Sequence, residues 1–154
     1  MWLAKPTYTT IAIGSAIAAR GLLVRALASG RVRKNEQLTT TGPYAHTRNP
    51  LYLGSVIIGV GFVLAGRSWW IALLTIVMFW AVYFPVIHSE EEFLRQRFPE
   101  FDDYARNVPR LFPRWHPYES SSEQFSWHLY WKHREYNAAL GWLLMVAVLV
   151  AKAV

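Results

Sequence analysis

Apolar residues gather into four long runs separated by polar segments, a pattern typical of an integral membrane protein. The runs cover about residues 8–28, 51–65, 69–87 and 137–153. Three of them approach the roughly 20 residues that a helix needs to cross a bilayer, and the run at 51–65 is shorter. We therefore predict an all-α helical bundle of about four transmembrane helices, formed by a single domain over residues 1–154.

The second and third runs are predicted to form a helical hairpin, because only the tight turn Gly66-Arg67-Ser68 separates them. A hairpin through the bilayer returns the chain to the side on which it entered. The polar segments 29–50 and 88–136 should therefore lie on one side of the membrane. Gly59 and Gly61 of the second run either allow close helix packing or frame a narrow portal for a lipidic molecule.

Composition and charge agree with a membrane protein. The chain is 53% hydrophobic with a mean hydropathy of +0.14, which is too apolar for an ordinary soluble domain of 154 residues. All 16 lysines and arginines except Lys5, Arg67 and Lys152 fall within residues 20–48 and 95–134. By the positive-inside rule, this bias predicts that both polar segments face the cytoplasm and both termini lie outside.

Several classes of function are disfavoured by the residue types. The net charge is +6, but the charges flank apolar runs, so contact with anionic headgroups explains them better than nucleic acid does. The absence of cysteine excludes thiol nucleophiles, thiolate metal ligands and disulfides. His128 and His133 are five residues apart with no carboxylate between them, so we expect no metal site. The oligomeric state stays open.

The polar stretch from Gly42 to Gly54 is the first candidate for chemistry. Pro43 and Pro50 each push the preceding residue out of helical geometry, so residues 42–50 should form an irregular connection whose side chains can converge on a ligand. Pro50 also suits a helix start, whose amino-terminus favours a nearby anion. The alternative is an interfacial turn in which Arg48 simply reaches the lipid phosphates.

The second candidate is the acidic cluster Glu90-Glu91-Glu92 at the end of the third run. Three consecutive carboxylates repel one another and lose hydration there, so they need cationic partners. In a continuing helix, Arg95 is placed to pair with Glu91, and Glu90 points about 100° away, toward Arg48. The alternative is a solvated acidic turn that marks the exit from the membrane.

The two clusters together contain an ordered set of polar, glycine and proline positions over about residues 42–114. The set is Gly42, Tyr44, Arg48, Asn49, Pro50, Tyr52, Gly54, Glu90, Glu91, Leu94, Phe98 and Val108-Pro109-Arg110. It resembles the membrane-embedded S-adenosylmethionine methyltransferases that include isoprenylcysteine carboxyl methyltransferase and phosphatidylethanolamine N-methyltransferase. Asn49 stands where the carboxyl methyltransferases have histidine, and residues 49–55 are similar to the phospholipid enzymes. An asparagine can hydrogen-bond but cannot take up a proton at neutral pH, so any acid or base role of that histidine does not carry over to Asn49.

The resemblance implies a cofactor, S-adenosylmethionine, with S-adenosylhomocysteine as product, held between the two clusters at the cytoplasmic face. Its ammonium group suits Glu90 or Glu91, its carboxylate suits Arg48, and its sulfonium suits tyrosine rings. The candidate cofactor-binding residues are Tyr44, His46, Arg48, Asn49, Pro50, Tyr52, Glu90 and Glu91. The candidate catalytic residues are Arg48, Asn49, Glu90 and Arg97.

The acceptor implied by the resemblance is a lipidic or small hydrophobic molecule. A carboxylate acceptor needs no base and only an arginine to orient it, for which Arg97, Arg106 and Arg110 are available. An amine must first lose a proton, which calls for a carboxylate such as Glu90. The sequence leaves both open, and the rival interpretation is a non-catalytic membrane scaffold or lipid-binding protein. Residues 125–134 are predicted to form an interfacial amphipathic helix.

Overall fold

A computed structural model describes residues 4–33, 36–120 and 123–153; Lys34, one of the cytoplasmic charges assigned above, lies outside them. Within these ranges the chain is helical and contains no strand. The long helices are α1 (Tyr8–Ser29), α2 (Pro50–Gly66), α3 (Trp69–Met78) continuing through η2 (Phe79–Tyr83) into α4 (Phe84–Arg97), and α7 (Tyr136–Ala153). The short helices are η1 (Gly42–Ala45), α5 (Phe101–Asn107) and α6 (Trp127–Lys132).

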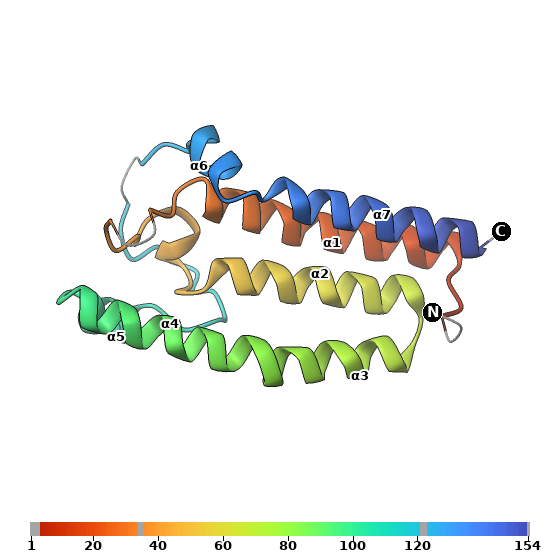
Figure 1. Cartoon of the computed structure of the whole chain (residues 1–154), viewed down its shortest axis with the longest axis horizontal. Coiled ribbons are helices and arrows are strands. Elements are labelled where there is room, and N and C mark those ends of the chain that lie inside the picture. The colour runs from red at the N-terminus through yellow and green to blue at the C-terminus, as the bar shows by residue number, and fades with distance from the viewer. Residues whose placement is uncertain (1–3, 34–35, 121–122, 154) are drawn as a thin grey trace.

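The predicted all-α membrane bundle is confirmed (Figure 1). Three helices of the described chain are long and apolar enough to cross a membrane, namely α1, the continuous helix Trp69–Arg97 and α7. The apolar α2 is shorter, with 17 residues, and supplies the fourth helix of the bundle. The third helix continues ten residues beyond its predicted end and therefore carries the acidic cluster on helical backbone.

The core of the bundle is the contact between α1 and α2, which depends on glycine. A methyl group on Gly21 would come within 2.5 Å of the Gly54 carbonyl oxygen, and one on Gly61 within 2.5 Å of the Gly14 carbonyl oxygen. The two backbones therefore touch at points seven residues apart on each helix. Gly61 serves close packing, and Gly59 faces the Thr75 side chain of α3, so neither glycine frames a portal.

Two groups of contacts hold α7 along α1. Near the termini, Ile11, Ala65 and Leu149 form a buried apolar cluster. At the other end, the Arg25 guanidinium donates to both carboxylate oxygens of Glu135, at 3.0 and 2.8 Å. Ile11 and Arg25 are 14 residues apart on α1, about four helical turns, so one face of α1 makes both contacts.

The helix Trp69–Arg97 widens into a π turn at η2, where the Phe84 amide donates to the Phe79 carbonyl. Pro85 follows immediately and has no amide hydrogen to donate, which interrupts the regular ladder at this point. The turn places the Tyr83 ring 5.5 Å from the Tyr52 ring of α2. This ring pair joins the two arms of the hairpin just below the acidic cluster.

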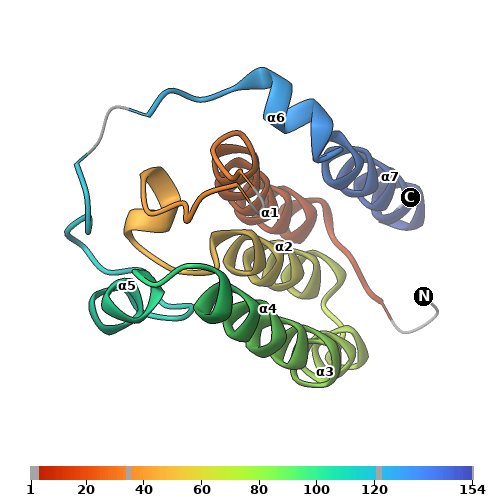
Figure 2. The ribbon, with the colours of Figure 1, turned by 60° about the vertical axis from the view of Figure 1, so that its left-hand side comes forward.

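Both polar segments lie at one end of the bundle, as the hairpin predicts, and the two termini lie at the other end (Figure 1). In the turned view of Figure 2, η1 lies beside the end of α1, and α5 lies beside α4. This region lies at the ends of α1 and α4 and at the starts of α2 and α7. The cytoplasmic orientation of this end stays a prediction.

Candidate functional site

Residues 42–50 form the predicted irregular connection, with one 3-10 turn at η1. Gly42 has φ +59°, a left-handed conformation that suits glycine, and Pro43 begins the turn. Pro50 is the first residue of α2, as expected, and its side chain is fully buried. Asn49, the residue before it, has φ −126° and ψ 58°, so the chain bends sharply into the helix.

The segment after α5 runs beside this connection and holds it in place. The backbone hydrogen bonds run from Arg48 N to Pro109 O, from Arg114 N to His46 O and from Tyr118 N to Ala45 O, all at 2.9 Å. The Thr47 hydroxyl adds contacts to the carbonyls of Arg110 and Leu111, at 3.3 and 3.0 Å. The connection is therefore fixed by backbone pairing rather than left as a mobile loop.

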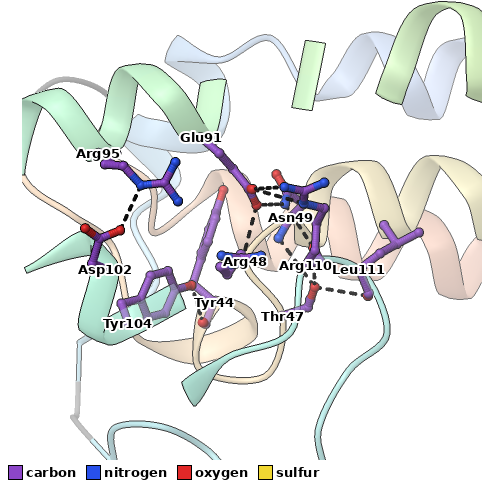
Figure 3. Close-up of polar contacts among 10 residues, drawn as sticks. All are labelled: Tyr44, Thr47, Arg48, Asn49, Glu91, Arg95, Asp102, Tyr104, Arg110 and Leu111. Carbon is purple, nitrogen blue, oxygen red and sulfur yellow. Dashed lines mark hydrogen bonds and ion pairs between the residues drawn. The ribbon is translucent and has the colours of Figure 1, made fainter. Parts of the chain in front are cut away.

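Glu91 is the centre of the polar contacts, with only 3% of its surface exposed (Figure 3). Arg110 donates to Oε2 from Nε at 3.0 Å and approaches it through Nη2 at 2.8 Å. The Asn49 amide donates to Oε1 at 3.1 Å, and Arg48 Nε lies 3.3 Å from the same oxygen. Three segments distant in sequence thus meet on one carboxylate.

Two of the predicted pairings were wrong. Glu91, not Glu90, faces Arg48, because the phase of α4 turns Glu91 into the protein and Glu90 out of that contact. Arg95 does not pair with Glu91; its Nε donates to Asp102 at 2.8 Å in an exposed ion pair. The start of α5 brings Asp102 to Arg95, and the sequence pattern of α4 alone does not contain that neighbour.

A cavity of about 190 Å³ adjoins this cluster. Its lining combines residues of both predicted clusters with residues of the chain after α1, of α4 and of α5. The lining residues are Val32, Arg33, Gln37, Leu38, Thr39, Tyr44, Arg48, Asn49, Leu51, Tyr52, Glu90, Glu91, Phe93, Leu94, Phe101 and Tyr104. The two clusters therefore share one site, as the hairpin geometry predicts.

Arg48 has unused donors at this cavity. Its Nε is buried and lies in ion-pair contact with Glu91, but it makes no hydrogen bond. The terminal nitrogens also have no hydrogen-bond partner among the described residues. Burial lowers the pKa of the Arg48 guanidinium, and the Glu91 carboxylate opposes this shift. A planar, charged and incompletely satisfied guanidinium is suited to bind an anion such as a carboxylate.

Glu90 lines the cavity without a cationic partner in the described parts of the chain. Its carboxylate interacts with the hydroxyl of Tyr52, which also lines the cavity. Glu91, in contrast, is already occupied by Arg48, Arg110 and Asn49. Glu90 is therefore the carboxylate available to a cationic ligand.

Two buried tyrosines form the wall behind Arg48. The Tyr104 hydroxyl donates to the Tyr44 carbonyl at 2.6 Å, which ties α5 to η1. Burial is the main cause that raises the pKa of both phenols, and Arg48 partly offsets the rise at Tyr104. Both phenols therefore stay neutral at physiological pH, and their rings offer uncharged faces to the cavity.

Comparison with known proteins identifies the family. A family model described as phospholipid methyltransferase matches residues 7–100, which include the bundle's first three long helices and both polar clusters. The chain belongs to this family of membrane methyltransferases. No solved structure matches the chain.

Two relatives of this family member have names that refer to metals. The nickel-cobalt-cadmium resistance protein NccN of Alcaligenes xylosoxydans xylosoxydans is 39% identical over 122 residues, which is 79% of this chain and 56% of the relative. The cobalt-zinc-cadmium resistance protein CzcN of Cupriavidus metallidurans is 34% identical over 151 residues, 97% of this chain and 68% of the relative. The chain thus spans between about half and two thirds of their length.

Not every predicted site residue of this family member reaches the cavity. His46 does not line it, and its Nδ1 is bonded to the Arg114 carbonyl at 2.8 Å. Pro50 contributes the helix start rather than a cavity wall. Arg97 is exposed near the end of α4 and lies outside the lining, as does Arg110, which is used by Glu91. The helix predicted at residues 125–134 forms only over Trp127–Lys132.

Sequence reasoning about this family member missed part of the cavity lining. Leu38, Thr39, Phe101 and Tyr104 line it, although nothing in their spacing sets them apart from ordinary core or loop residues. The sequence did contain one indication that the segment after α5 belongs to the site. Val108-Pro109-Arg110 is part of the ordered set of residues that carries the resemblance. Its contacts with Arg48 and Glu91 give that pattern a physical explanation.

Proposed function

We propose that this chain transfers a methyl group from S-adenosylmethionine to a lipidic or small hydrophobic acceptor at the cavity beside Glu91. The observation that carries the proposal is that one cavity is lined by the Arg48 guanidinium, whose Nε makes no hydrogen bond, and by the Glu90 carboxylate, which has no cationic partner among the described residues. Membership of a membrane methyltransferase family supports the reaction class. The aromatic walls at Tyr44 and Tyr52 suit a soft cation.

The donor set fits the amino-acid part of the cofactor. That part is a zwitterion, and Arg48 offers free nitrogens for its carboxylate while Glu90 offers a free carboxylate for its ammonium group. Arg48 Nε lies 3.3 Å from Glu91 Oε1 without a hydrogen bond, so the protein satisfies this guanidinium incompletely. Once bound, the cofactor supplies a sulfonium-linked methyl group that is ready for in-line displacement.

The chain's own residues then have to position the reactants and keep water out. Glu91 orients Arg48, and Asn49 fixes Glu91, so the anion-binding group is held before a ligand arrives. For a carboxylate acceptor no proton has to move. For an amine acceptor the proton must be taken up by a nearby base, and Glu90 is the cavity carboxylate without a cationic partner.

Transfer can be tested with radiolabelled methyl donor, purified protein and a membrane lipid extract. We expect label in the lipid fraction with the wild-type protein and with Glu92→Gln, and at least tenfold less with Glu90→Gln or Arg48→Ala. Glu92 is the matched control because it neighbours the site on α4 but is exposed and outside the cavity. Base-labile label indicates an ester, and base-stable label indicates an amine.

A non-catalytic scaffold or lipid-binding protein is the competing function. It predicts no labelled lipid with any variant, and it predicts that Arg48 and Glu90 substitutions change only stability. A wild-type protein that remains folded, as judged by circular dichroism, but transfers no label to any lipid of its native membrane would favour the scaffold.

The relatives' names add a cellular setting to the proposal. We propose that methyl transfer by this chain contributes to resistance against divalent metal ions, since both relatives are named as metal resistance proteins. Cells that depend on this chain should lose growth on cadmium or cobalt when it carries Glu90→Gln, and keep it with Glu92→Gln. Equal protection by both variants would separate any metal resistance from methyl transfer.

A further inference from the structure

The turn that follows α5 exposes two large aromatic side chains. Phe112 is 80% exposed and Trp115 is 95% exposed, the highest value among the large hydrophobic residues of the described chain. Both belong to residues 110–115, which we call the arginine-aromatic loop. Such side chains favour burial, so their exposure at a fixed position indicates a surface that a partner or a lipid phase covers.

The loop is rigidly placed rather than free. Its first residue, Arg110, contacts α4 twice, through the Glu91 carboxylate and through the Phe84 ring, whose centroid lies 5.9 Å from the guanidinium carbon. Backbone hydrogen bonds at Arg48 and His46 hold the loop at both ends. In Figure 1 the chain after α5 turns back beside the start of α2 and the end of α4.

This position is the level at which the bundle changes from apolar to polar surface. Below it, α3, η2 and the start of α4 expose apolar rings such as Trp80 and Phe84. Above it, α4 carries the acidic cluster. A bilayer that covers the apolar rings therefore ends close to the loop, which is the headgroup level where tryptophan rings are favoured.

The charge of the loop favours an anionic surface. Residues 108–118 contain Arg110 and Arg114 and no acidic residue; Arg110 is paired with Glu91, so the charge that faces a membrane comes from Arg114. The negative surface potential of a membrane that contains anionic lipid attracts arginine side chains near it. A protein partner could also cover two aromatic rings, but the matching depth and charge both favour lipid.

A second exposed aromatic pair lies at the same end of the bundle. Trp127 and Trp131 of α6 are 67% and 59% exposed, and Lys132 ends the same helix. In Figure 1, α6 and the chain after α5 lie at a similar level along the bundle. Two aromatic and basic elements at one level are expected for a molecule that sits in the headgroup region at this end.

We propose that the arginine-aromatic loop is a membrane anchor that inserts Phe112 and Trp115 into the headgroup region of an anionic bilayer. The anchor is separate from the transmembrane helices. Arg110 joins the loop to Glu91, which lines the cavity. The inference does not depend on methyl transfer, because it rests on exposure, charge and position alone.

The natural absence of cysteine allows a site-specific probe. The protein carrying Phe112→Cys is labelled with nitrobenzoxadiazole and placed in nanodiscs of phosphatidylcholine alone or mixed with phosphatidylglycerol. Gln96→Cys is the matched control, since Gln96 is exposed near the end of α4. Lipids with a spin label near the headgroup serve as quenchers.

We expect blue-shifted emission at position 112, quenching several-fold stronger than at position 96, and a further increase with phosphatidylglycerol. Emission like that of the control in both lipids would overturn the proposal. A blue shift without quenching by lipid would overturn it too, because a protein surface would then cover the loop. Equal quenching in both lipids would overturn the assignment to anionic lipid.

Discussion

The amide nitrogen of Asn49 donates to Glu91 Oε1 at 3.1 Å and to the Arg110 carbonyl at 2.9 Å. Both partners are acceptors, and an amide nitrogen carries two hydrogens, so one side chain satisfies both. A neutral histidine has one ring N–H and can satisfy only one of them. Asn49 is therefore suited to joining α4 and the arginine-aromatic loop, which is a positioning role and needs no proton transfer.

Asn49→Asp should destabilise the protein strongly. The change removes both donated hydrogen bonds and places a second carboxylate against buried Glu91, so we expect the free energy of unfolding to fall by about 3 kcal/mol. Thermal unfolding in detergent, followed by circular dichroism, measures the effect. Asn107→Asp is the matched control because Asn107 is exposed, and it should change little; equal midpoints for the two variants would refute the role of Asn49.

Substitutions of the adjacent residues Glu90 and Glu91 should differ strongly in their effect on stability. Glu91→Ala leaves Arg48 and Arg110 beside each other without their buried counter-charge, so we expect a loss of about 3–5 kcal/mol of stability. Glu90→Gln removes no partner from a cation and should change stability by no more than about 0.5 kcal/mol. Chemical denaturation of both variants in one detergent compares them, and a Glu90 variant as unstable as the Glu91 variant would contradict this assignment.

The tie between Arg25 and Glu135 should hold three helices together. Arg25 also donates to the Ser55 hydroxyl at 2.6 Å, so α1, α2 and the start of α7 meet at one guanidinium. This pair is mostly buried, with 23% and 8% side-chain exposure. Glu135→Ala should therefore lower the free energy of unfolding by about 3 kcal/mol, as expected for an unpaired, partly buried arginine.

The exposed pair between Arg95 and Asp102 is the control for the Arg25–Glu135 tie. Its side chains are 50% and 57% exposed, so solvent screens the attraction and Asp102→Ala should leave the unfolding midpoint almost unchanged. Both variants can be followed by the same thermal unfolding assay. If Glu135→Ala lowers the unfolding midpoint as little as Asp102→Ala does, the ion pair between Arg25 and Glu135 does not stabilise the fold.

Alkaline pH should destabilise the fold through the buried phenols. Burial raises the pKa of Tyr44 and Tyr104 above the ordinary value of about 10, so both are neutral in the folded protein when they would already ionise in the unfolded chain. Their contribution is complete below pH about 10 and is lost as pH rises further. Unfolding midpoints measured from about pH 9 to about pH 11, one unit either side of the ordinary tyrosine pKa of about 10, should fall less steeply in Tyr44→Phe than in the wild-type protein. An identical slope would contradict this cause.

The helices could be predicted from the sequence because apolar runs and a tight turn are local signals. The four runs, the hairpin and the meeting of the polar segments at one end all follow from them. The choice between Glu90 and Glu91 could not be made, because it depends on the rotation of α4 relative to the rest of the bundle. A shift of one residue turns a helical side chain by about 100°.

Contacts between backbone groups also could not be predicted from the sequence. The hydrogen bond between Arg48 and Pro109 joins a backbone amide to a backbone carbonyl. Every residue has the carbonyl and every residue except proline has the amide hydrogen, so residue types cannot predict this pairing. The partner of Arg95 was also unpredictable, since Asp102 reaches it only after the chain reverses between α4 and α5. Local pattern thus predicts which segments meet, and tertiary packing decides which atoms meet.

Calorimetric titration of S-adenosylhomocysteine into the purified protein tests the central claim most directly. We predict saturable binding by the wild-type protein and by Glu92→Gln, and binding at least tenfold weaker, about 1.4 kcal/mol, in Glu90→Gln and Arg48→Ala, with Glu90→Gln as stable as wild type. Circular dichroism confirms folding of each sample before titration. No binding by the folded wild-type protein, or equal binding by Glu90→Gln and Glu92→Gln, would contradict the account.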